Sequence, residues 1–105
     1  MLLTTTPSVE GRPITRYCGI VSSDFIIDLA AERGLLGEIR DFFREHNKSL
    51  EAVIAKAKDE ALASLTEKAE LCGAKAVVGI NFNILRTGTD GSELHISVSG
   101  TAVVI

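Results

Sequence analysis

The chain has 105 residues, of which 46% are hydrophobic and 24% are charged, which is typical of one globular domain covering residues 1–105. The net charge of −3 argues against nucleic acid as a partner, because contacts to phosphates require a basic surface. No segment contains a run of the about 20 consecutive apolar residues that a helix needs to cross a bilayer, so no membrane partner is expected. The segment that begins at Met1 lacks the features of a secretory signal, and a cytoplasmic location with reduced thiols is expected.

The first part of the chain, from Leu2 to about Ile27, has the pattern of extended backbone. Residues 11–13 form a turn signal, and alternation from Ile14 to Val21 has the period of two that predicts a strand. Apolar residues fall on both faces of this strand. We therefore expect each face to be partly buried.

The middle of the chain is helical. A short amphipathic helix is predicted over about Leu35–Phe43, and residues 46–49 interrupt the pattern before a long helix begins near Leu50. Gly73 suits the left-handed position after the end of this helix. The long helix is predicted because small and apolar residues recur at the spacing of one helical face: Leu50, Val53, Ile54, Ala57, Ala61, Leu65, Ala69 and Cys72. Cys72 is therefore expected in the core.

The last third of the chain predicts a β-hairpin. An apolar run over Ala76–Leu85 forms its first strand, and the turn falls at Gly88–Gly91, where Asp-Gly favours positive φ. The return strand alternates, with Leu94, Ile96, Val98, Ala102 and Val104 expected inward and His95, Ser97, Ser99 and Thr101 expected outward.

These elements predict an α+β fold, a two-layer β-α-β-β sandwich with an antiparallel sheet, one long helix and a short preceding helix. Such a sheet has two edges and one uncovered face. Its closing strand, which ends at Ile105, carries no charge after Glu93 unless His95 is protonated. Exposed edges of this kind can hydrogen-bond to the edge of another chain, so the subunit is expected to form a closed ring of identical copies.

The candidate metal ligands are Cys18, Cys72, His46 and His95. Thiolates select soft monovalent or divalent ions such as Cu(I) and Zn(II), and imidazole suits Zn, Cu and Ni. None of the four has the close spacing of a metal motif, but symmetry in a ring would repeat each ligand around an axis. Cys18 is the first predicted ligand, with a packed thiol as the alternative. His95 is the second, with an exposed or interface histidine as the alternative.

Catalytic motifs are absent from the sequence, which has no Ser-His-acid order, nucleophile elbow or phosphate-cradling loop. Asp59 and Glu60 are adjacent on the predicted helix and point in different directions. We therefore expect no enzymatic activity. Two interpretations stay open: a ring that holds a soft metal ion or a small ligand at subunit interfaces, and a structural or protein-interaction ring with no ligand.

Five segments in a fixed order carry a resemblance to a known family: Thr5-Thr6-Pro7 with Glu10-Gly11, Tyr17–Val21, the long charged helix, Gly73–Ile80 and Ser97–Val103. Together they resemble the YbjQ-like family, small bacterial and archaeal proteins described as "putative heavy-metal-binding". The resemblance implies a dodecin-like β-α-β-β subunit in a homopentamer, with short extra strands that join neighbours. It brings no established activity. Lys75 departs from the acidic residue common in the family, and the match over Asp24–Gly34 is loose.

Overall fold

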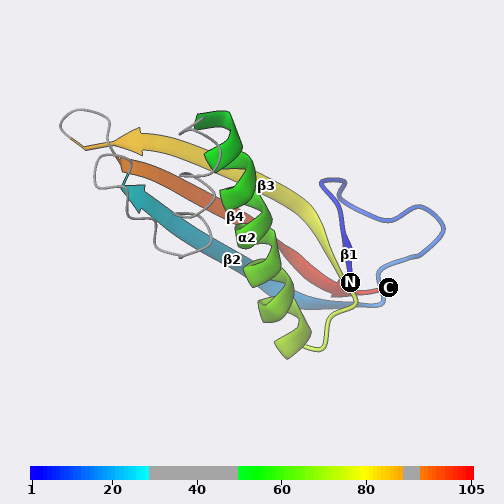
Figure 1. Cartoon of the computed structure of the whole chain (residues 1–105). Coiled ribbons are helices and arrows are strands. Elements are labelled where there is room, and N and C mark those ends of the chain that lie inside the picture. The colour runs from blue at the N-terminus through cyan, green and yellow to red at the C-terminus, as the bar shows by residue number, and fades with distance from the viewer. Residues whose placement is uncertain (29–49, 89–92) are drawn as a thin grey trace. The chain divides into compact units, whose positions relative to one another are not determined.

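The computed structural model describes residues 1–28, 50–88 and 93–105. Along the chain it has strands β1 (Leu2–Leu3) and β2 (Arg16–Asp28), helix α2 (Leu50–Leu71), and strands β3 (Ala76–Thr87) and β4 (Glu93–Val104) (Figure 1). This order confirms the predicted α+β class. The short helix predicted over Leu35–Phe43 and most of the predicted turn at Gly88–Gly91 lie outside the described residues.

The sheet is mixed, because a fourth strand that was not predicted, β1, adds a parallel pair to the three predicted strands. Its four strands lie in the order β1-β3-β4-β2, and β1 is parallel to β3, with Leu2 opposite Ala76 and Leu3 opposite Val77. β4 runs in the opposite direction to β2 and β3 (Figure 1). The alternation pattern missed β1 because a strand of two residues is too short to show a period of two.

The described residues form two compact units, each with its own buried side chains. Unit 1 comprises Met1–Ser23, Leu62–Phe82 and Val98–Ile105, and unit 2 comprises Asp24–Ala61 and Asn83–Ser97. The buried apolar residues of unit 2 are Ile27, Val53, Ala57, Ala61, Leu94 and Ile96. Those of unit 1 are Val21, Leu65, Ala69, Ala74, Ala76, Val77, Val78, Ile80, Val98, Ala102 and Val103.

Helix α2 buries five of the eight residues of the predicted stripe fully: Val53, Ala57, Ala61, Leu65 and Ala69. Ile54 is half-buried, and the burial of Leu50 lies outside what the structure describes. The helix ends in a Schellman motif. Gly73 N donates to Glu70 O at 3.0 Å and Ala74 N donates to Ala69 O at 3.1 Å, while Gly73 has the predicted left-handed backbone at φ 78°. Cys72 is exposed, so its predicted place in the core is wrong. It follows the last helical residue, Leu71, where helical periodicity no longer fixes which residues are buried.

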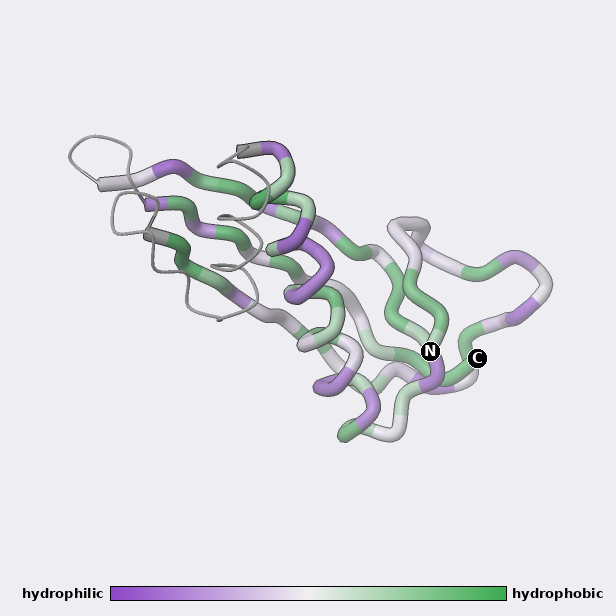
Figure 2. The backbone as a smooth tube through the Cα atoms, in the orientation of Figure 1, coloured by the Kyte–Doolittle hydropathy of each residue, from purple (hydrophilic) through white to green (hydrophobic). Residues whose placement is uncertain are grey.

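Strand β4 alternates as predicted (Figure 2), with even-numbered positions from Leu94 to Ala102 buried and the intervening ones half-exposed. Val104, predicted inward, is only half-buried. Val103 is fully buried and packs with Ala76 and Val78. Because alternate residues of a strand face opposite sides of a sheet, this is a second small cluster on the other face. Three partly buried residues cover it: Val9, Ile14 and Ile105. No helix within the described ranges has the length and apolar character needed to cross a membrane.

Among the glycines of unit 1, Gly100 of β4 has the closest neighbours. A Cβ on Gly100 would lie 2.6 Å from Val77 Cγ1 and 3.2 Å from the carbonyl oxygen of Val78. Gly100→Ala is therefore expected to lower the free energy of unfolding by about 1–3 kcal/mol through overpacking. Urea denaturation at a fixed protein concentration measures this. The control is Ser99→Ala, at a half-exposed neighbouring position. Equal stability of Gly100→Ala and the wild type would contradict the packing described.

Candidate functional site

The first predicted ligand, Cys18, lies on β2, the outermost strand on its side of the sheet. Its thiol is free, and the residue is half-buried. Two large apolar neighbours on the same strand are exposed, Tyr17 at 70% and Ile20 at 85%. We call Tyr17, Cys18 and Ile20 the β2 edge. In a single chain the apolar side chains of this edge are exposed to water, and the thiol between them forms no disulfide.

Strand β2 lies beside the C-terminal half of α2. Ser23 Oγ donates to Ser64 Oγ at 2.9 Å, and Lys68 Nζ donates to the carbonyl oxygen of Ser22 at 2.6 Å. Ser23 is only 5% exposed, so Ser64 satisfies a hydroxyl that water does not reach. These contacts hold β2 against the helix.

The alternation of β2 is interrupted at Gly19. Val21 and Ser23 are buried, whereas Ile20 and Ser22 are exposed. Strict alternation would place Cys18 with the exposed set, yet it is half-buried. Gly19, at this point of the strand, has φ 118°, a conformation that glycine adopts without strain.

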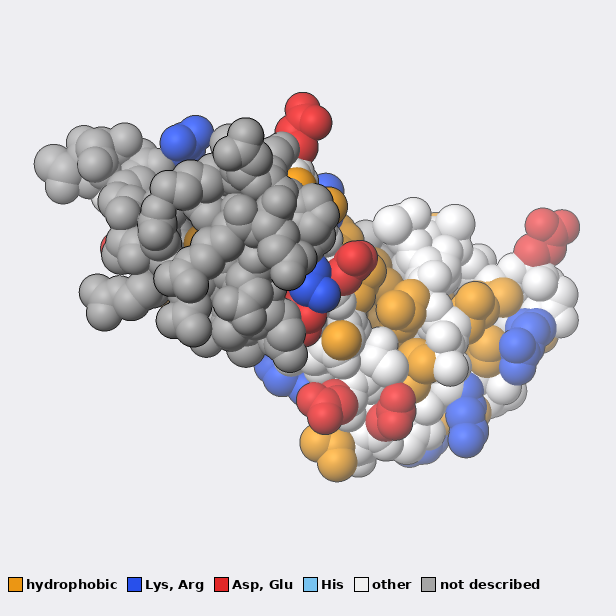
Figure 3. Space-filling view, viewed as in Figure 1, with side chains coloured by type: hydrophobic (Ala, Val, Ile, Leu, Met, Phe, Trp, Pro, Cys, Tyr) orange, Lys and Arg blue, Asp and Glu red, His pale blue; other side chains and the backbone are white. Residues whose placement is uncertain are grey.

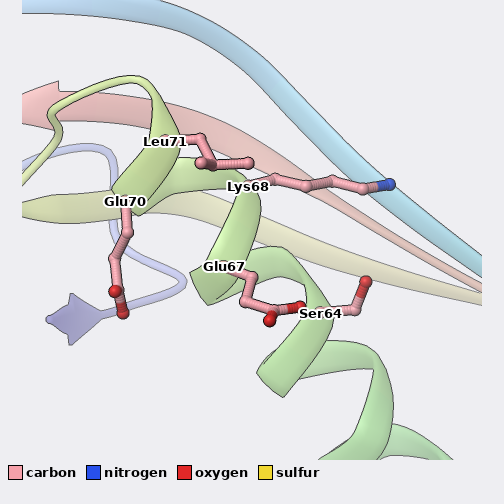
Figure 4. A pocket seen from close by; sticks show the side chains of 5 residues that line it. All are labelled: Ser64, Glu67, Lys68, Glu70 and Leu71. Atoms are coloured by element: carbon pink, nitrogen blue, oxygen red, sulfur yellow. The ribbon is translucent and has the colours of Figure 1, made fainter.

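An open groove of about 630 Å³ runs along the end of α2, lined by Ser64, Glu67, Lys68, Glu70 and Leu71. Figure 4 shows Lys68 extending toward β2, whereas Glu70 points away from that strand. Leu71 is 89% exposed. Acidic, basic and hydrophobic side chains are interspersed on the face shown in Figure 3. The groove therefore combines free carboxylates with an uncovered leucine.

The second predicted ligand, His95, lies in unit 2 and faces outward as predicted. Its Nε2 is 3.5 Å from Glu93 Oε2, and Thr87 Oγ1 lies 3.5 Å from the same carboxylate oxygen. His95 belongs to the lining of a hollow of about 250 Å³, formed with Asp24, Phe25, Ile26, Asn83, Leu85, Ile96 and Ser97. Imidazole, carboxylate, amide and hydroxyl groups therefore share this hollow with apolar side chains.

Cys18 belongs to unit 1 and His95 to unit 2, so the two predicted ligands occupy separately described sites. Within residues 1–28, 50–88 and 93–105, no group of three or more His, Cys, Asp and Glu side chains could hold a metal ion. His46 lies outside the described residues. Metal binding by Cys18 and His95 stays a prediction.

The contacts of Ser23 and Ser22 with α2 were not predicted from the sequence. Gly19 was the one sequence feature that could have indicated where the alternation of buried and exposed residues in β2 changes.

Comparison with known proteins gives matches over the full length. A family model described as "Putative heavy-metal-binding" matches residues 1–105. Two proteins named "UPF0145 protein", from two strains of Caulobacter vibrioides, are each 42% identical over 105 residues, which is 100% of both chains. A crystal structure of a protein of unknown function of the DUF74 family, from Pediococcus pentosaceus, aligns with a TM-score of 0.68 and 22% identity. It covers 100% of this chain and 97% of that one, and at this identity the likeness shows the fold.

The hydrogen bond between Ser23 and Ser64 can be tested by removing one or both hydroxyls. Ser64→Ala leaves the buried Ser23 hydroxyl without a partner and is expected to lower the free energy of unfolding by about 1–3 kcal/mol. The double variant Ser23→Ala/Ser64→Ala removes both groups and is expected to be less destabilised than Ser64→Ala. Chemical denaturation checks this, with Ser22→Ala as the exposed control on β2. A double variant that loses the sum of the two single effects would contradict the coupling.

Proposed function

The chain belongs to the YbjQ-like family, and on that premise we propose that it forms a homo-oligomer that binds a soft metal ion through the thiol of Cys18. The observation that carries the proposal is the β2 edge, where a free, half-buried thiol lies between two exposed apolar side chains. Thiolates favour soft ions, and the family description names heavy metals. A cytoplasmic location would keep the thiol reduced and available.

Self-association is supported by the same surface. β2 ends the strand order, so in the described part of the chain its outer edge carries no paired strand. Unpaired edge groups can hydrogen-bond to another chain, and covering Ile20 and Tyr17 would stabilise the contact by about 25 cal/mol per Å² of apolar area. We propose that this edge contributes to the contact between copies. The family resemblance suggests five copies.

An oligomer also supplies further ligands. His95 lies on an outward sheet face with one carboxylate at 3.5 Å, and imidazole is a good ligand for Zn, Cu and Ni. In a symmetric assembly every ligand is repeated, so a site that one chain begins can be completed by another. We propose His95 as the second ligand residue, at or beside a subunit interface.

A structural or protein-interaction ring without a ligand is the second candidate. It is favoured by the exposure of Ile20, Tyr17 and Leu71, because apolar side chains of this size serve any protein contact equally well. In neither case do the described residues suggest a catalytic role, and we propose that the protein is not an enzyme. The two candidates differ in whether Cys18 binds metal.

Association through the β2 edge is tested by charging it. Ile20→Lys is expected to shift the oligomer to smaller species, because a buried and unpaired ammonium is costly in an interface. Size-exclusion chromatography with light scattering measures the mass. The matched control is Ala63→Lys, on an exposed part of α2, which is expected to keep the wild-type mass. An unchanged mass for Ile20→Lys would remove the β2 edge from the interface.

The metal site is tested by Cys18→Ser, which replaces the thiol with a hydroxyl of similar size. Metal content measured by mass spectrometry after growth in zinc- and copper-supplemented medium is expected to fall to background, with the oligomeric mass unchanged. Loss of metal in this variant supports the binding ring. Metal content equal to the wild type would exclude Cys18 as a ligand and leave the ring without a ligand as the better account.

A further inference from the structure

We draw no further inference here: the strongest candidate, the groove of about 370 Å³ beside strand β1 that is lined by Leu3, Thr4, Thr5, Leu62, Ile80 and Phe82, carries none because nothing in the structure shows what covers it.

Discussion

The close approach of α2 to the sheet is the constraint on which the rest of the structure depends. The helix turns a fully buried stripe inward, and three of its members, Ala57, Ala61 and Ala69, are alanines that occupy little space between backbones. In unit 1 this approach is close enough for Ser64 on the helix to accept a hydrogen bond at 2.9 Å from Ser23 on β2. A larger stripe would separate these groups and leave a buried hydroxyl unpaired.

That approach determines what β2 can present. Ser23 and Ser22 are tied to α2, and beyond them, at Gly19, the alternation of buried and exposed residues along β2 changes. One consequence is that the apolar side chains of Tyr17 and Ile20 are left to solvent. The other is that Cys18 is half-buried, although strict alternation would expose it. A surface that favours association and a thiol that favours soft metals thus lie at the same place on β2.

Much of the fold follows from periodicity in the sequence. The stripe from Val53 to Ala69, the alternation of β4 and the left-handed Gly73 were all predicted, because each depends on local backbone geometry that repeats or ends at a recognisable residue. β1 was not predicted, since its pairing with Ala76 and Val77 is a tertiary contact.

Less of the candidate site than of the fold could be predicted from the sequence. Cys72 continues the helical spacing by number but follows the end of the helix, so periodicity gave the wrong burial. The half-burial of Cys18 departs from strict alternation in β2, and the glycine beside it did not predict this departure. Whether Cys18 and His95 serve one assembly depends on contacts between copies, which no pattern within one chain encodes.

Native mass spectrometry of the untagged protein, purified without chelator, tests the central claim most directly, because it reads the number of subunits and the bound mass together. The account predicts a closed oligomer, five subunits by family resemblance, that carries metal in a fixed ratio to its chains. A monomer without bound metal would contradict both the association through the β2 edge and the metal site at Cys18.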